Sequence, residues 1–295
     1  MAVRLNEPEA VGLSLRQGFV GELRRLARLV TSAAGRSAAR RDETVHEVRK
    51  SLKRLRALLR LLRHALGPAE YRRENLALRD TARPLAEVRD AKVFVGTIQA
   101  LARRRSSRGT AARQLAPVVE RLAAHHRALA ERVLGTDRGL EAAAAVLAAV
   151  GARAERWTLP EDQGWKLLKP GFERTYRRGQ RAWRHARREG TSEALHEWRK
   201  EVKYLLYQLQ VIELAWGAAE RMLARRLDRL ADLLGEDHDL AVVGTMVDDP
   251  VVDRLIDRRR TVLQRQAFTA GGLVFQTPAA TRLRSLENAW ERWPR

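Results

Sequence analysis

Apolar and polar residues follow a helical period along almost the whole chain. Apolar side chains recur every three to four positions, and the strict alternation that is typical of β-strands is rare. The pattern predicts an all-α protein in which amphipathic helices, joined by short loops, pack as antiparallel neighbours in bundles. The predicted helices span residues 11–33, 44–66, 69–82, 86–104, 110–134, 138–156, 165–188, 193–216, 219–234, 238–247, 251–268 and 279–292.

Glycine and proline residues mark the ends of these helices, because glycine favours helix termini and proline cannot continue a helix. The segment 269–277, which contains two adjacent glycines, gives the weakest helical pattern. The predicted breaks lie at Gly35, Gly67-Pro68, Pro84, 105–109, Gly135, 159–164, Gly190, Gly217, Gly235, Pro250 and Gly271-Gly272.

The chain contains an internal duplication. Residues 45–67 read VHEVRKSLKRLRALLRLLRHALG, residues 195–217 read LHEWRKEVKYLLYQLQVIELAWG, and nine of these 23 positions are identical. The preceding segment repeats as well, because Gly18, Phe19, Arg24, Arg25 and Arg28 correspond to Gly171, Phe172, Arg177, Arg178 and Arg181. Downstream, LAEVRD at 85–90 corresponds to LGEDHD at 234–239. Two copies are too few for a solenoid, so we expect one domain, 1–295, whose repeats 1–156 and 157–295 form two pseudo-symmetric antiparallel helical bundles.

Each copy of the duplicated segment predicts a helix with one buried face and one cationic face. Apolar residues repeat with 3-4 spacing from position 45 to 66 and from position 195 to 216. The cationic side chains are centred about 130° from that stripe, at about 100° per residue. They are His46, Arg49, Lys50, Lys53, Arg56 and Arg60 in the first copy, and His196, Arg199, Lys200 and Lys203 in the second, followed by Tyr204 and Tyr207.

The composition indicates that this cationic face binds an anion. The 57 Lys and Arg residues exceed the 36 Asp and Glu residues by 21, and only seven of the 57 are lysines. Four of the seven are the equivalent pairs Lys50, Lys53 and Lys200, Lys203. Most basic stripes are simply solvated, but a row of cations with few acids repels itself unless an anion binds, which favours an anion-binding role here. Nucleic acid, an anionic membrane surface and a phosphate polymer are the candidate polyanions.

A third basic cluster precedes the second copy and matches arginines that precede the first. If each of these helices packs beside the following one, four basic faces converge in a central groove or pore lined by Arg and Lys. Arginine binds a phosphate group through two N–H groups at once, whereas lysine is a mobile point charge. A mixture of the two suits a flexible anion with repeating units. The cluster comprises Arg174, Arg177, Arg178, Arg181, Arg184, Arg187 and Arg188, interleaved with Tyr176 and Trp183.

The repeated histidines have two interpretations. Thr44 and Glu47 have the spacing of a capping box, which would place His46 in the first helical turn. There it would donate an N–H to a phosphate oxygen, or make a helix-start hydrogen bond to a neighbouring carboxylate or carbonyl. The segments HEVRK and HEWRK lack the second histidine of a metal-binding HExxH motif. The cluster Glu236-Asp237-His238-Asp239 could hold a metal, but its counterpart at 87–90 has Val88 and Arg89 in place of Asp237 and His238. We therefore expect no metal and interpret Asp90 and Asp239 as caps or partners of buried arginines.

Several classes of protein are disfavoured by the sequence. The absence of cysteine excludes a disulfide framework and a zinc–thiolate site. The longest apolar run, 142–150, is far shorter than the roughly 20 residues of a membrane span. The beginning of the sequence has no apolar signal region, so we expect a cytoplasmic protein. Binding to a membrane surface is a further possibility, but we expect no membrane partner because the apolar faces of the helices are needed for the bundles.

The duplicated segments resemble the CHAD family, the conserved histidine α-helical domain. The resemblance lies in VHEVRKSLKRLR at 45–56, LHEWRKEVKYLLY at 195–207, Arg89-Asp90 and TYRRGQRAW at 175–183, and it extends over nearly the whole chain. It implies two pseudo-symmetric bundles, a central basic pore and binding of inorganic polyphosphate, in some members on polyphosphate granules. The sequence departs from the pattern at His238, where the first copy has Arg89. It also lacks the ExExK signature of the CYTH triphosphatase domain to which some members are fused.

Three functions follow as hypotheses. The first is non-catalytic binding of inorganic polyphosphate without a cofactor. The alternative is nucleic-acid binding, of which a weak, salt-sensitive form is expected from the net charge, although no base-reading motif is present. An enzyme acting on phosphoanhydrides is disfavoured, because the basic stripes contain almost no carboxylates to hold Mg²⁺. The candidate polyphosphate-binding residues are Arg24, Arg25, Arg28, His46, Arg49, Lys50, Lys53, Arg56, Arg60, Arg177, Arg178, Arg181, His196, Arg199, Lys200, Lys203 and Tyr207.

Overall fold

The computed structural model of the protein describes residues 3–6, 8–32, 37–104, 110–134, 137–247 and 249–294. Within these ranges the chain forms ten α-helices, one short 3₁₀ helix and no β-strand, which confirms the all-α prediction. The helices are α1 (Val11–Thr31), α2 (Ala38–Leu61), α3 (Arg63–Arg104), α4 (Thr110–Leu134), α5 (Asp137–Ala154), α6 (Trp165–Glu189), α7 (Ser192–Val211), η1 (Glu213–Ala215), α8 (Ala218–Gly244), α9 (Pro250–Phe275) and α10 (Ala279–Glu291).

Three of the predicted breaks are wrong, because the residues concerned lie inside long helices. Pro84 is within α3, Gly235 is within α8, and Gly271-Gly272 is within α9. A Cβ atom at Gly271 would lie 2.5 Å from the ring of Trp198, so this glycine leaves room for a neighbouring helix instead of ending its own. The predicted breaks at Gly35, 105–109 and Gly135 lie outside the described residues.

The predicted break at Gly67-Pro68 is confirmed as a sharp kink within α3. Gly67 has φ 76° and ψ 165°, a backbone conformation that glycine adopts without steric cost. Pro68 then begins the longer part of the helix, at a position where its missing N–H would have no helical partner. The kink therefore follows directly from the local sequence.

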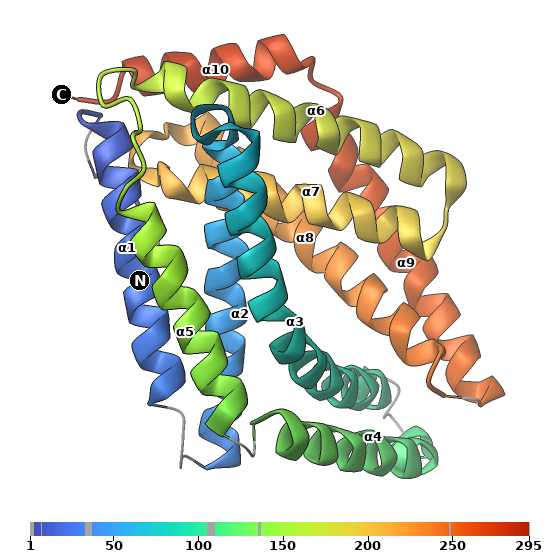
Figure 1. Ribbon diagram of the computed structural model, residues 1–295. Helices are drawn as coiled ribbons and strands as arrows, with labels where there is room; N and C mark the ends of the chain where they lie inside the picture. Colours follow the sequence, from blue (N-terminus) through green and yellow to red (C-terminus); the bar gives the residue numbers. More distant parts are fainter. Residues whose placement is uncertain are drawn as a thin grey trace.

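The helices pack in pairs, and the same pairings occur in both halves of the chain. In the first half α2 packs on α3, α3 on α4 and α1 on α5, and in the second half α7 packs on α8, α8 on α9 and α6 on α10. Figure 1 shows α1 and α5 side by side at one edge and α4 below the end of α3. The two halves meet where α2 packs on α7 and α3 packs on α8.

The apolar stripes of the duplicated segments are buried, as predicted. In the first copy every stripe position except Leu66 is at most 3% exposed, and in the second copy the whole stripe is equally buried. Both stripes belong to one continuous hydrophobic core, in which Trp198 and Trp157 are among the largest side chains. Because the apolar face of each helix is used for this core, its cationic face is left for another role.

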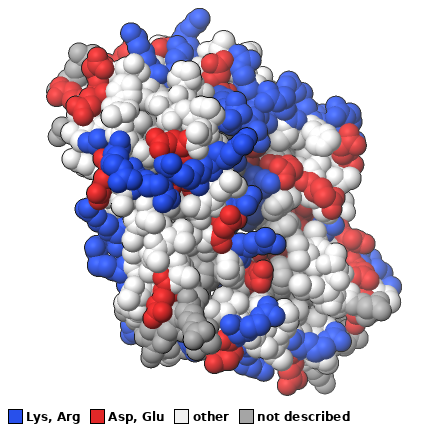
Figure 2. Space-filling model, in the orientation of Figure 1, with Lys and Arg blue, Asp and Glu red and all other residues white. Residues whose placement is uncertain are grey.

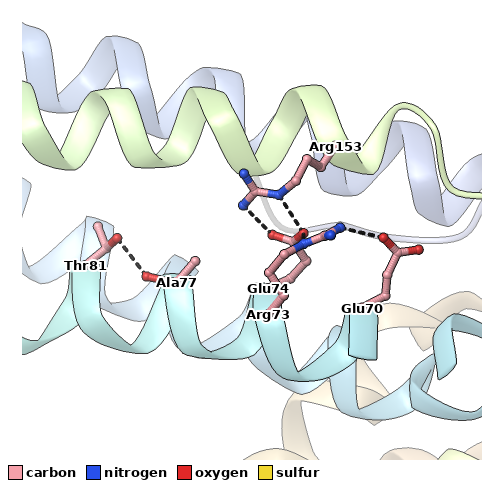
Figure 3. Close-up of polar contacts among 6 residues, drawn as sticks. All are labelled: Glu70, Arg73, Glu74, Ala77, Thr81 and Arg153. Carbon is pink, nitrogen blue, oxygen red and sulfur yellow. Dashed lines mark hydrogen bonds and ion pairs between the residues drawn. The ribbon is translucent and has the colours of Figure 1, made fainter. Parts of the chain in front are cut away.

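A buried ion pair fixes α5 on α3. Glu74 is fully buried, and it accepts hydrogen bonds of 2.7 Å on both carboxylate oxygens from Arg153. Figure 3 shows Arg153 reaching down from α5 to Glu74, with Arg73 and Glu70 beside it on α3. A buried carboxylate needs such partners, because burial without them costs several kcal/mol.

Gly171 allows a close approach between helices of the two halves. A Cβ atom at this position in α6 would lie 2.2 Å from the carbonyl oxygen of Leu61, at the end of α2. Backbone atoms cannot move aside as a flexible side chain can, so the distance between α6 and α2 depends on glycine here. Gly21 in α1 offers a contrast, because a Cβ there would meet nothing within 4 Å.

We predict that Gly171→Ala destabilises the protein by about 1–3 kcal/mol, the usual cost of overpacking. Gly21→Ala is the matched control, and it should stabilise the protein by up to about 1 kcal/mol through helix propensity. Urea unfolding followed by circular dichroism measures both changes. Equal stability of Gly171→Ala and the wild type would contradict the close approach.

Candidate functional site

A solvent-accessible cavity of about 930 Å³ lies between α2, α3, α7 and α8. Its lining includes side chains from both copies of the duplicated segment, which are far apart in the sequence. The structure thus brings together part of the predicted set. The predicted residues that line the cavity are His46, Arg49, Lys50, Lys53, Arg199, Lys203 and Tyr207.

The contact between α2 and α7 directs these side chains into a common space. Ala57 packs against the rings of Tyr204 and Tyr207, and Gln208 Nε2 donates a hydrogen bond of 3.2 Å to the carbonyl oxygen of Ala57. Tyr207 lies at the cavity wall, with the guanidinium of Arg54 5.8 Å from its ring centre. The rings of Tyr204 and Tyr207 therefore pack against α2, and their faces can interact favourably with nearby cations.

The two equivalent arginines of the cavity differ in their partners. Arg49 is 8% exposed, and its Nη1 donates to Asp90 Oδ1 at 2.9 Å and to the carbonyl oxygen of Ala86 at 3.0 Å. This confirms the interpretation of Asp90 as the partner of a buried arginine. Among the described residues Arg199 has no ion pair, and its buried Nε lacks a hydrogen-bond partner. The cationic charge of Arg199 is therefore less neutralised than that of Arg49.

The charged forms of Lys53 and Lys203 are disfavoured in the cavity, so the pKa of each lysine is lowered. Desolvation by the surrounding walls, together with the charges of Arg49 and Arg199, lowers the pKa of Lys53 to about 8. Burial and the charge of Arg199 also lower the pKa of Lys203. A bound anion would raise the pKa of both lysines again, because it would favour their charged forms.

Each repeated histidine contacts the corresponding position of its own copy. Arg89 Nε donates to His46 Nδ1 at 3.2 Å, which places the ring proton of neutral His46 on Nε2. The ring of His196 lies 4.3 Å from that of His238. Arg89 and His238 therefore occupy equivalent places, although their chemistry differs.

The predicted helix start before His46 is wrong. α2 begins at Ala38, so Thr44 is a buried residue within the helix and not its N-cap. His46 consequently lies in the third turn, beyond the reach of the terminal dipole. Partial burial and the charge of Arg89 lower the pKa of His46, and burial with the charge of Lys200 lowers that of His196, so the surroundings favour the neutral form of both rings.

Opposite the cations, α8 contributes an acidic wall that the sequence analysis missed. Asp228, Asp232 and Asp239 line the cavity at intervals that place them on one face of the helix. Burial raises the pKa of Asp239 to about 6, against the effect of Arg199. The acidic spacing along α8 is visible in the sequence, but only the packing of α8 on α7 shows that it faces the cations.

The carboxylates of Glu236 and Asp237 hold α9 on α8. Glu236 accepts two hydrogen bonds of 2.8 Å from Arg259, and Asp237, which is 2% exposed, accepts one of 3.1 Å from Arg260. Within the described part of the chain, no group of three or more His, Asp or Glu side chains is arranged to hold a metal ion.

The other predicted residues lie outside the cavity, so the expected convergence of four basic faces does not include α1 and α6. Arg28 and Arg181 are exposed. The remaining contacts are Arg24 with Glu155, Arg25 with Glu22 and Glu47, Arg56 with Asn75, Arg60 with the Tyr204 ring, Arg177 with Glu173, Arg178 with Glu201, and Lys200 with Glu197.

Arg25 and Arg178, which are equivalent in the duplication, each pair with a buried carboxylate, but the two carboxylates do not lie at equivalent positions. Arg25 bonds Glu22 on its own helix at 2.8 Å, whereas Arg178 bonds Glu201 on the next helix at 2.7 Å. The duplication equates Glu201 with Ser51, which also accepts from Arg25. Both arginines therefore neutralise a buried carboxylate at the contact between two consecutive helices.

Positive charge also extends over the outside of the molecule. Figure 2 shows Lys and Arg side chains in a band across the upper half of one face, with Asp and Glu side chains beside it. No helix in the described ranges is long and apolar enough to cross a membrane.

Comparison with known proteins identifies the fold. The crystal structure of the CHAD domain from the plant Ricinus communis superimposes with a TM-score of 0.54 at 18% sequence identity, and the match covers 100% of this chain and 97% of that one. A search of curated proteins found no relative of this sequence. The sequence matches the CHAD domain over residues 23–248. The chain therefore belongs to the CHAD domain family.

Proposed function

We propose that the protein binds inorganic polyphosphate in the cavity between α2, α3, α7 and α8. The observation that carries this proposal is that Lys53 and Lys203, which are equivalent in the duplication, line the same cavity with Arg49 and Arg199. Both lysines have a lowered pKa, so an anion stabilises their charged form. On this view the cavity is the basic groove at the junction of the repeats 1–156 and 157–295.

The lining favours a phosphate chain over a nucleic acid. Recognition of single-stranded nucleic acid relies on aromatic platforms or on polar groups that read base edges. Among the described lining residues Tyr207 is the one Phe, Tyr or Trp, and its ring lies near the cations Arg54 and Lys203. A polyphosphate chain needs no such platform, because it carries negative charge at every unit.

We further propose that binding is non-catalytic and needs no cofactor, and that the protein acts in the cytoplasm on polyphosphate granules. Hydrolysis of a phosphoanhydride needs a metal ion or an equivalent clamp, and a group that activates water. The cavity carboxylates Asp228, Asp232 and Asp239 form no metal-holding cluster with their described neighbours. Their more direct effect is to limit the positive charge of the cavity.

The first prediction concerns the paired lysines. Lys53→Ala combined with Lys203→Ala should weaken binding of long-chain polyphosphate about 100-fold, because two charge-assisted contacts are lost. Isothermal titration calorimetry at physiological salt measures the change. The matched control is Lys166→Ala combined with Lys169→Ala, which removes two lysine charges from α6, outside the cavity.

Equal weakening by the two double variants would show that binding depends only on net charge. Competition with duplex DNA in the same buffer tests the alternative function, and preference for DNA would reverse the order of the two hypotheses. Release of phosphate above the blank, from purified protein with Mg²⁺ and polyphosphate, would overturn the non-catalytic assignment.

The second prediction concerns pH. Asp239, with a pKa of about 6, is faced by Arg199 from α7, Arg89 and Asp90 from α3, and Lys53 from α2. Protonation removes a negative charge from the cavity, so polyphosphate affinity should rise about three- to tenfold from pH 7.5 to 5.5. Asp239→Asn should bind more tightly than the wild type at pH 7.5 and show a smaller rise.

Fluorescence anisotropy with labelled polyphosphate at constant ionic strength measures this dependence. Above pH 8 the affinity should fall again as Lys53 loses its proton, and Lys53→Ala should lack that fall. An identical pH profile in Asp239→Asn and the wild type would contradict the role given to the acidic wall.

A further inference from the structure

A second basic pocket lies apart from the cavity, where the end of α2 and the kink of α3 meet α6. Its volume is about 320 Å³, and no carboxylate is among its described lining residues. In Figure 1 this is the region where the first turns of α3 lie beneath α6. The lining consists of Arg60, Arg63, His64, Arg174 and the two Gly-Pro pairs Gly67-Pro68 and Pro170-Gly171.

Two of the arginines are held by aromatic rings instead of by acids. The guanidinium of Arg60 lies 4.0 Å from the ring centre of Tyr204, and that of Arg63 lies 4.6 Å from the ring centre of Tyr71. A ring face fixes a guanidinium group by cation–π attraction, yet it accepts none of the N–H groups in the guanidinium plane. These groups therefore remain available to an anion.

The charges of this pocket are not neutralised within the described residues. Arg60, Arg63 and Arg174 form no ion pair there, and the buried Nε of Arg60 has no hydrogen-bond partner. Burial and the neighbouring charge of Arg63 lower the pKa of Arg174, as expected where cations gather without acids. This differs from Arg25 and Arg178, each of which has a buried carboxylate.

The duplication provides an internal comparison. The positions of the second copy that correspond to Arg60, Arg63 and His64 are Gln210, Glu213 and Leu214, and the position in the first copy that corresponds to Arg174 is Gly21. Neither the three arginines nor the histidine has a basic residue at the corresponding position of the other copy. The cluster is therefore not a general property of the repeated unit, nor a simple consequence of helix packing.

We propose that this pocket is a second anion site, which binds a compact phosphate anion of the size of pyrophosphate. Three arginines and a histidine match a multivalent anion better than a single carboxylate, because the Arg fork binds phosphate oxygens in pairs. The pocket also borders Gly67 and Pro68, at the kink where the longer part of α3 begins. The phosphate groups come from free pyrophosphate or from the end of a polyphosphate chain.

The test uses the residues that the second copy carries at these positions. Arg63→Glu combined with His64→Leu is introduced into the full chain that already carries Lys53→Ala and Lys203→Ala, so that the larger cavity contributes least. Pyrophosphate affinity, measured by isothermal titration calorimetry, should fall about tenfold or more. Arg226→Glu in the same background removes the same net charge from the outside of α8 and should change the affinity less than about twofold.

A second variant guards against misfolding. Arg174→Gln, on α6, should weaken pyrophosphate binding in the same direction, and the circular dichroism spectrum and Tm of each variant report whether the fold is kept. The proposal is overturned if the background protein binds no pyrophosphate at millimolar concentration, or if Arg63→Glu with His64→Leu leaves the affinity unchanged.

A final arm distinguishes the two sources of phosphate. Polyphosphate of defined length is titrated into protein that carries only Arg63→Glu and His64→Leu. Weaker binding than to the wild type assigns the pocket to the end of the chain held in the cavity, and unchanged binding, with pyrophosphate binding lost, assigns it to a free phosphate anion. Failure of the lysine pair to affect long-chain polyphosphate would contradict the proposed function without affecting this pocket.

Discussion

The structure depends on the contact between two helices of like charge, α2 and α7. Their apolar stripes are buried in a common core, and Ala57 packs between Tyr204 and Tyr207 where the helices meet. Because the apolar faces are buried in this core, the cationic faces of α2 and α7 line the same cavity. The resulting repulsion is limited by Asp90 at Arg49 and by the aspartates of α8. The charge that remains includes that of Lys53, Lys203 and Arg199, on which the proposed function rests.

Most helices could be predicted because their apolar positions alternate at three- and four-residue spacing and because Gly190 and Gly67-Pro68 are true ends or kinks. The breaks expected at Gly235 and Gly271 could not be judged from the sequence. Gly271 leaves room for the ring of Trp198 on α7, whereas a Cβ atom at Gly235 would make only an ordinary contact with Arg199, so this glycine neither ends the helix nor is required by its neighbours. The predicted start of α2 at Thr44 was wrong, because residues with the spacing of a capping box here lie inside the helix.

The candidate site was predictable only in part, for physical reasons. The duplication singled out Lys53 and Lys203, since equivalent positions on equivalent helices meet at the same junction. It could not separate them from Arg25 and Arg178, which are equally repeated but pair with buried carboxylates. Those carboxylates changed helix between the copies, so no aligned position reveals them. The acidic wall on α8 likewise required knowledge of the packing of α8 on α7.

The central claim is that the cavity cations, and not the general positive surface, hold a phosphate chain. A crystal structure of the protein with a polyphosphate of defined length tests this most directly. The account predicts phosphate groups in the cavity within about 3 Å of Lys53 Nζ and Lys203 Nζ. Well-ordered phosphate groups along the outer arginines of α6, with the cavity free of them, would contradict it.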